Sequence, residues 1–177
     1  MTQEKGCILW FTGLSGAGKT TISAGVEEKL KTQGYKVELL DGDIVRTNLS
    51  KGLGFSKEDR DINIRRIGFV AHLLSRNGVI AITAAISPYK TIRDEIREME
   101  PNFIEVYVNA SLEMCEKRDI KGLYAKARAG QLKGFTGIDD PYEEPTNPEI
   151  ICNTDTETID ESIAKVISYL AQSGYIK

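Results

Sequence analysis

Short apolar segments alternate with longer amphipathic stretches along the whole chain. The five apolar segments are CILWF (7–11), VELL (37–40), VIAIT (79–83), FIEVYV (103–108) and EIIC (149–152). Nearly continuous apolar runs of this length are typical of strands that are buried on both faces of a parallel sheet. The pattern therefore predicts a central parallel sheet of about five strands.

Helical spacing of apolar residues appears between these segments. Three predicted helical faces consist of Ile22, Val26 and Leu30, of Ile64, Ile67, Val70 and Leu74, and of Ile159, Ile163, Val166 and Leu170. Strands that alternate with helices predict a three-layer α/β domain, in which ligands bind outside the carboxyl ends of the strands. We find no internal repeat and no linker, so residues 1–177 are predicted to form one domain.

Composition narrows the classes of function. Apolar residues make up 41% of the 177 residues and charged residues 28%, which is ordinary for a globular domain. The net charge of −3 argues against nucleic-acid binding. The N-terminus lacks the pattern of a signal peptide, and no apolar run is long enough for a membrane span. Cys7, Cys115 and Cys152 lack metal-ligand spacing. We expect a cytoplasmic protein with reduced thiols.

The stretch GLSGAGKT (13–20, the phosphate loop) follows the first predicted strand and opens the first predicted helix. Its glycines let backbone N–H groups point at phosphate oxygens, and the helix N-terminus adds positive potential. Lys19 is expected to reach the β- and γ-phosphates of ATP, and the Thr20 hydroxyl to ligate Mg²⁺. The predicted ATP contacts are Gly13, Leu14, Ser15, Gly16, Ala17, Gly18, Lys19 and Thr20. The alternative is a glycine-rich turn without a ligand, which the strand before it and the helix after it disfavour.

A carboxylate beside the γ-phosphate is predicted at the end of the second strand. The third strand carries no Asp at its tip, whereas the second ends VELLDGD, with Asp41 and Asp43. We favour Asp43 for holding Mg²⁺ and for orienting an attacking hydroxyl. Asp41 is the weaker candidate, because Asp before Gly also makes a good turn. The chain has no Asn-Lys-x-Asp motif of a GTPase, and the D-x-x-G at residues 119–122 is interpreted as coincidence.

Four arginines follow Asp43: Arg46, Arg60, Arg65 and Arg66. Guanidinium groups pair well with phosphate and sulfate oxygens, so the cluster favours an anionic acceptor. Each arginine alone would equally suit a solvated helix face, and at least one of the adjacent pair is expected to be structural. Asn63 lies on the helical face of Arg60 and could bond a ribose or a base.

Two loop aromatics and one serine are further candidates for contact with the acceptor. Phe55 and Phe135 either fill gaps or stack on a purine base, and their position beside anion-binding stretches favours stacking. Ser87, in AISP (85–88), could be a nucleophile or a substrate contact. We favour contact, because activating a hydroxyl needs a nearby general base and direct transfer needs none.

A basic segment follows the fourth predicted strand. Residues 117–135 are rich in Lys and Arg and contain two glycine turns, which suggests a mobile lid over phosphates. An exposed charged helix is the alternative for most of these residues. Arg118 and Lys121 are the two for which we favour a ligand contact.

These motifs together resemble the adenylyl-sulfate kinase family. The resemblance rests on DGDIVR, LGFSKEDRDINIRRIG, ISPYKTIRDEIR and the long stretch FIEVYV…DIKGLYAKARAGQLKGFTGIDDPYEEP, and it runs from about residue 6 to the C-terminus. It implies a P-loop kinase fold, Mg²⁺, a homodimer, and transfer of the ATP γ-phosphoryl to the 3′-hydroxyl of adenosine 5′-phosphosulfate. No sulfurylase domain is attached, so a stand-alone kinase is expected.

The resemblance also implies which residues contact the acceptor. They are Asp43, Arg46, Phe55, Arg60, Asn63, Ile86, Ser87, Lys121, Gly134 and Phe135, with Arg118 on the ATP side and Lys19, Asp43 and Ser87 as catalytic residues. The family's serine in this position has been described as a phosphorylated intermediate. Phe69 departs from the charged residue expected there, which we expect to alter surface or dimer packing. A kinase for another small hydroxyl acceptor and a catalytically silent nucleotide-binding regulator are the alternatives.

Overall fold

The computed structural model describes residues 5–177, so residues 1–4 of the predicted domain lie outside the described range. Its strands are β1 (Cys7–Thr12), β2 (Val37–Asp41), β3 (Ile80–Ala84), β4 (Phe103–Asn109) and β5 (Ile150–Asn153). Its helices are α1 (Lys19–Thr32), α2 (Gly42–Asn48), α3 (Lys57–Ser75), α4 (Lys90–Met99), α5 (Leu112–Arg118), α6 (Leu123–Arg128) and α7 (Ile159–Gln172). Each predicted strand is confirmed to within one or two residues at its ends.

The strands form one parallel sheet in the order β2-β3-β1-β4-β5. The predicted α/β architecture is therefore confirmed. In the register of the sheet, Asp41 pairs with Ala84, and Ala84 pairs with Phe11. The segments that follow β1, β2 and β3 consequently leave the sheet side by side, at its carboxyl edge.

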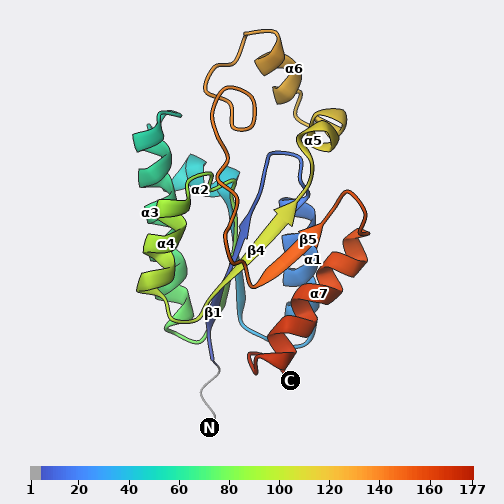
Figure 1. Cartoon of the computed structure of the whole chain (residues 1–177). Coiled ribbons are helices and arrows are strands. Elements are labelled where there is room, and N and C mark those ends of the chain that lie inside the picture. Colours follow the sequence, from blue (N-terminus) through green and yellow to red (C-terminus); the bar gives the residue numbers. More distant parts are fainter. Residues whose placement is uncertain (1–4) are drawn as a thin grey trace.

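Helices cover both faces of the sheet (Figure 1), with α1 and α7 packed together on one face and α3 and α4 on the other. Side chains of β1 alternate between two cores, Leu9 and Phe11 in one and Ile8 and Trp10 in the other. All six residues of β1 are buried, because a helix layer lies over each side of this central strand. That arrangement explains why the strand shows no polar alternation.

The predicted helical faces are mostly buried, with Ile64 and Ile67 of α3 in the core, Val70 and Leu74 half-buried, and Ile159 of α7 exposed. The α1 face and the residues Ile163, Val166 and Leu170 of α7 lie in the core. Ile159 is 51% exposed, because α7 begins at this residue and the first turn contributes Ser162 and Ile163 to the buried side instead. Thr158 and Glu161 form a capping box that fixes this start.

The basic segment 117–135, hereafter the lid segment, contains the end of α5, all of α6 and the loop that follows. Figure 1 shows α5 and α6 beyond the carboxyl edge of the sheet, at the end of the molecule opposite the described N-terminal strand start and the C-terminus. Within residues 5–177, no helix combines the length and the hydropathy that crossing a bilayer requires.

Candidate active site

The phosphate loop owes its shape to glycines at positions where other residues would not fit. Gly13 has φ 153°, and a Cβ there would lie 2.4 Å from the Val108 carbonyl oxygen. Gly18 has φ 112° and occupies the N-cap of α1 in the left-handed region. The loop therefore turns tightly between β1 and α1, with the N-terminus of the helix at its end.

Lys19 lies inside the curl of this loop. Its Nζ donates hydrogen bonds to the carbonyl oxygens of Gly13 (2.9 Å) and Leu14 (2.7 Å), and the residue is 9% exposed. Burial lowers the pKa of the Lys19 ammonium to about 8. Within residues 5–177 no carboxylate forms an ion pair with this ammonium, which is held where an anionic phosphate would lie.

The neighbouring Thr20 and the nearby Asp43 carry oxygens that suit Mg²⁺. Thr20 is exposed in the first turn of α1, and within residues 5–177 its hydroxyl makes no hydrogen bond. The same range holds no cluster of three His, Cys, Asp or Glu side chains that would form a cage for a metal ion. Mg²⁺ beside phosphates usually takes only one or two protein oxygens and fills its other positions with phosphate and water. The residues therefore fit this ion.

Arg118 reaches the phosphate loop from the lid segment. Its Nη1 donates to the carbonyl oxygens of Gly16 (3.1 Å) and Ala17 (3.3 Å), and its Nη2 to that of Thr154 (2.6 Å). Arg118, which the sequence analysis assigns to the ATP side, thus lies beside the phosphate loop. Thr154, in the β5–α7 loop, also donates a hydrogen bond from its hydroxyl to the Ala17 carbonyl oxygen, a contact that no sequence motif indicates.

Tyr124 of α6 is a second link between the lid segment and the phosphate loop, through a hydrogen bond of 2.8 Å from its hydroxyl to the Ser15 carbonyl. The carboxylate of Asp119 accepts hydrogen bonds from the backbone N–H groups of Tyr124 and Ala125, which lie in the first turn of α6. The D-x-x-G motif at residues 119–122 therefore lies at the start of α6. This position agrees with the interpretation that its similarity to a GTPase motif is a coincidence.

Asp41 and Asp43 have different positions at the end of β2. Asp41 is the N-cap of α2, and its Oδ1 accepts hydrogen bonds from the backbone N–H groups of Asp43 (3.0 Å) and Ile44 (3.3 Å). The Asp43 side chain is 78% exposed, and its Oδ2 pairs with Lys121 Nζ at 2.6 Å. The structure brings Asp43 together with the lid lysine singled out from the sequence, and gives Asp41 a structural position.

Arg46 and Phe55 lie together beyond α2. Arg46 donates from Nη1 to the carbonyl oxygens of Leu53 and Gly54, and its guanidinium lies 4.3 Å from the centre of the Phe55 ring. The Phe55 ring is 66% exposed, which leaves it open to a ligand.

Arg60 lies against the end of the lid segment and the residues that follow it. It is ion-paired with Asp140 (2.6 Å), donates to the Thr136 hydroxyl (3.2 Å) and donates to the Gly134 carbonyl oxygen. Phe135, in the same segment, is 9% exposed and packs edge-on against Tyr124, with ring centres 5.0 Å apart. Phe135 thus belongs to the core, in contrast to Phe55.

Asn63 is 6% exposed, and its Oδ1 has no hydrogen-bond partner within residues 5–177. Of the two adjacent arginines, Arg65 forms a double hydrogen bond with Glu95, and Arg66 donates to the Leu49 carbonyl oxygen. The expectation that at least one of this pair is structural holds for both.

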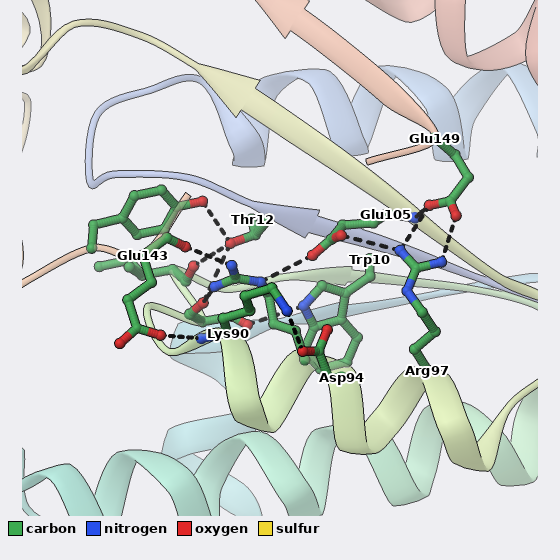
Figure 2. Close-up of polar contacts among 12 residues, drawn as sticks. Trp10, Thr12, Lys90, Asp94, Arg97, Glu105, Glu143 and Glu149 are labelled. Carbon is green, nitrogen blue, oxygen red and sulfur yellow. Dashed lines mark hydrogen bonds and ion pairs between the residues drawn. The ribbon is translucent and has the colours of Figure 1, made fainter. Parts of the chain in front are cut away.

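The β3–α4 loop (residues 85–89) lies beside the phosphate loop. The Ile86 carbonyl oxygen accepts hydrogen bonds from Thr12 Oγ1 (2.7 Å) and from the backbone N–H of Gly13 (3.5 Å). Ser87 is 2% exposed, and its Oγ accepts a hydrogen bond of 3.0 Å from the indole N–H of Trp10. Figure 2 shows the polar contacts around Trp10 and Thr12, and it includes Glu105 and Glu143.

Ser87 has φ 51°, which is rare for a residue with a side chain and costs about 1–3 kcal/mol. The chain's one histidine, His72, is hydrogen-bonded to Glu100 at 2.9 Å. Among the described residues no hydrogen bond joins a histidine or a carboxylate to the Ser87 hydroxyl. The geometry supports the interpretation of Ser87 as a contact residue.

Comparisons with known proteins agree with this arrangement. A family model described as adenylylsulphate kinase matches residues 5–153. The adenylyl-sulfate kinase of Picosynechococcus sp. is 66% identical over 174 residues, which cover 98% of each chain. The structure of the Mycobacterium tuberculosis APS kinase in complex with AMPPNP and APS has a TM-score of 0.90 at 44% identity, covering 94% of this chain and 98% of that one.

A hexameric APS kinase from Thiobacillus denitrificans is a more distant structural match. Its TM-score is 0.76 at 37% identity, and the match covers 99% of this chain but 30% of that one.

Proposed function

Because the chain belongs to the adenylylsulphate kinase family, we propose that it transfers the γ-phosphoryl group of ATP to the 3′-hydroxyl of adenosine 5′-phosphosulfate. The products are 3′-phosphoadenosine 5′-phosphosulfate and ADP. The observation that carries the proposal is the position of Lys19 and Asp43, whose segments leave neighbouring parts of one sheet edge after β1 and β2. Donor and acceptor would meet there.

The donor would be held by the phosphate loop, residues 13–20. Its backbone N–H groups and the start of α1 favour negative charge, and Lys19 already lies within the loop. Arg118 supports the loop by donating hydrogen bonds to the carbonyl oxygens of Gly16 and Ala17. We assign ATP binding to these groups.

Mg²⁺ would be held by Thr20 and Asp43, where it would neutralise charge on the β- and γ-phosphates. Asp43 would orient the ribose hydroxyl and accept its proton late in the transfer, because an unperturbed hydroxyl is too weak an acid to ionise early. Its exposed carboxylate is paired with Lys121, which would exchange that partner for substrate.

The acceptor would lie between α2, α3, the lid segment and the β3–α4 loop. We assign the phosphosulfate to guanidinium and ammonium groups and the adenine to an aromatic ring, for which the exposed Phe55 is best placed. The proposed acceptor contacts are Asp43, Arg46, Phe55, Arg60, Asn63, Ile86, Ser87, Lys121, Gly134 and Phe135.

The kcat/KM for ATP is expected to fall as the pH rises through about 8. Burial lowers the pKa of Lys19 to about 8 in the free protein, so the ammonium loses its proton in this range. Bound phosphates favour the charged form, so kcat should stay level to a higher pH than kcat/KM does. The measurement is a pair of pH profiles at fixed ionic strength. The residual activity of Lys19→Arg should lack the decline, and a flat kcat/KM profile in the wild type would contradict the assignment.

Arg60→Ala is expected chiefly to raise the KM for adenosine phosphosulfate. Losing hydrogen bonds to a charged ligand group corresponds to about 10- to 100-fold in KM. Steady-state kinetics at saturating ATP measures this effect. Arg65→Ala is the matched control, because Arg65 lies on the same helix but is held by Glu95. An unchanged KM in Arg60→Ala would show that Arg60 only holds the segment around Asp140.

Ser87→Ala is expected to keep more than about a tenth of wild-type turnover, since direct transfer needs no covalent intermediate. The Ser87 hydroxyl is buried and accepts a hydrogen bond from the Trp10 indole, which supports this expectation. Turnover at background level, together with phosphoserine detected by mass spectrometry in the wild type, would favour a compulsory phosphorylated intermediate.

We also propose a single-domain, cytoplasmic homodimer that acts in sulfate assimilation. The exposed Phe69, 55% accessible on α3, is a candidate for dimer packing. Light scattering coupled to size-exclusion chromatography tests the oligomeric state.

The decisive experiment is incubation of the purified protein with γ-labelled ATP and adenosine phosphosulfate, followed by identification of the labelled product. A panel of small hydroxyl acceptors, including nucleosides and sugar acids, separates this activity from that of another P-loop kinase. Binding of ATP without turnover of any acceptor would indicate a nucleotide-binding regulator.

A further inference from the structure

A strained serine lies at the place where the proposed acceptor and donor sites meet. Ser87 combines φ 51° with 2% exposure, and it carries a side chain that this region of the Ramachandran map disfavours. Such a conformation persists only when surrounding groups determine it. The groups that hold Ser87 therefore set the position of the whole β3–α4 loop.

Arg93 of α4 is the principal group of this kind. It is 1% exposed, and its guanidinium donates to the Ser87 carbonyl oxygen (2.6 Å), to Glu105 Oε1 (2.9 Å) and to the Glu143 carbonyl oxygen (2.5 Å). The Trp10 indole holds the Ser87 hydroxyl from the other side, at 3.0 Å. Ser87 is thus fixed at both its carbonyl and its hydroxyl group.

The same loop is bonded to the donor side. The Ile86 carbonyl oxygen accepts from the Thr12 hydroxyl and the Gly13 N–H, and the Gly13 carbonyl oxygen accepts from Lys19. Hydrogen bonds and the short stretches of backbone between them therefore connect the buried Arg93, through the β3–α4 loop, with the lysine of the phosphate loop.

We propose that Arg93, assisted by Trp10, is a positioning residue that fixes the acceptor at the correct distance from the phosphate loop. Arg93 does so by holding Ser87 in its left-handed conformation and by joining the β3–α4 loop to residue 143, in the segment that returns from the lid. The inference rests on the proposed function, in which Ile86 and Ser87 contact adenosine phosphosulfate.

Glu105 explains why arginine is required at this position. Its carboxylate lies in the middle of β4, is 6% exposed and pairs with both Arg93 and Arg97. A buried guanidinium with three directed acceptors has a fixed orientation, which a lysine ammonium cannot reproduce. A purely structural ion pair would need only the contact with Glu105, whereas Arg93 also reaches the loop.

The test uses the full-length chain with three variants and one matched control. Arg93→Met removes the guanidinium, but Glu105 keeps Arg97 as its partner. Arg93→Lys keeps the positive charge but lacks the planar set of N–H donors of the guanidinium. Trp10→Phe removes the N–H donor together with part of the buried ring, and it keeps an aromatic ring against Phe103. The control Arg97→Met also loses a contact with Glu105 but does not touch Ser87.

The expected result is selective loss on the acceptor side. In Arg93→Met, kcat/KM for adenosine phosphosulfate should fall about 100-fold, the scale of a misplaced substrate, while the Kd for a non-hydrolysable ATP analogue measured by calorimetry stays close to the wild-type value. Arg93→Lys should recover part of the loss. Trp10→Phe should lose about five- to tenfold, as for one hydrogen bond. Arg97→Met should lower Tm without changing the acceptor KM.

Three outcomes overturn the proposal. One is a wild-type acceptor KM in Arg93→Lys and Trp10→Phe, which remain informative if Arg93→Met fails to fold. Another is an equal loss of acceptor and nucleotide affinity, and the third is an equal acceptor defect in Arg97→Met. Failure of the wild type to phosphorylate adenosine phosphosulfate is a different result, because it refutes the proposed function before any variant is compared.

Discussion

Lys19→Ala is expected to lower kcat by at least about two to three orders of magnitude, with little change in the fold. The Lys19 ammonium lies inside the phosphate loop and donates hydrogen bonds to the carbonyl oxygens of Gly13 and Leu14, so it is oriented before the substrate arrives. Loss of one such preoriented electrostatic partner of the transition state typically costs about 10²–10³ in kcat. Single-turnover measurements at saturating ATP and acceptor would show the loss in the chemical step.

A second variant separates catalysis from stability. Lys19→Met keeps most of the buried volume and removes the charge. Because burial lowers the pKa of Lys19, the folded protein disfavours the charged form, and Tm should not fall in this variant. Loss of activity in a protein of unchanged Tm assigns the effect to the charge. Lys19→Met with a kcat within tenfold of wild type would contradict the proposed donor site.

Asp43→Ala and Asp43→Asn are expected to lower kcat to a comparable extent, about 10²-fold or more. Asn keeps the size of the side chain but can neither take up a proton nor attract Mg²⁺ as a carboxylate does. The largely exposed side chain belongs to no core cluster, so Tm should stay near its wild-type value. The measurement is kcat over a range of Mg²⁺ concentrations. Partial recovery at high Mg²⁺ would identify metal binding as the main function of Asp43.

Two further variants isolate the effect of Asp43. Asp41→Asn removes a charge two residues away and keeps a side chain that caps α2 well, so it should have little effect on kcat. Lys121→Ala breaks the ion pair with Asp43 and should act mainly on the acceptor KM. A loss of kcat in Asp41→Asn equal to that in Asp43→Asn would assign the effect to general charge at the end of β2.

The fold could be predicted because its determinants are local. Each strand is a short apolar run, and each large helix repeats apolar residues at its own period, so the sheet and its layers follow from pattern alone. The phosphate loop could be predicted for the same reason, since its glycines, Lys19 and Thr20 are consecutive. Ile159 was placed on the wrong side because periodicity does not show where a helix begins.

The site was predicted less completely, because much of it depends on contacts between distant parts of the chain. Arg93 is bonded to Glu143, 50 residues away in the sequence, and Trp10 is bonded to Ser87, 77 residues away. No local sequence pattern indicates such pairs. One signal was available. Glu105 interrupts the apolar run FIEVYV, and a carboxylate in a strand buried on both faces needs a cationic partner. Searching for that partner would have led to the two arginines of α4.

The two loop aromatics show the same limit. Phe55 and Phe135 have similar glycine-rich surroundings in the sequence, yet one ring is open and the other belongs to the core. The difference comes from Tyr124, a residue of the lid segment against which the Phe135 ring packs.

Trp10 is the chain's single tryptophan, and its indole nitrogen is bonded to the serine at the junction of the two proposed substrate sites. The tryptophan fluorescence of the protein, which excitation near the red edge of the absorption band separates from that of the tyrosines, therefore comes from one chromophore at an informative place. Stopped-flow mixing could use this emission, without an attached dye, to record when each substrate arrives and in which order they bind.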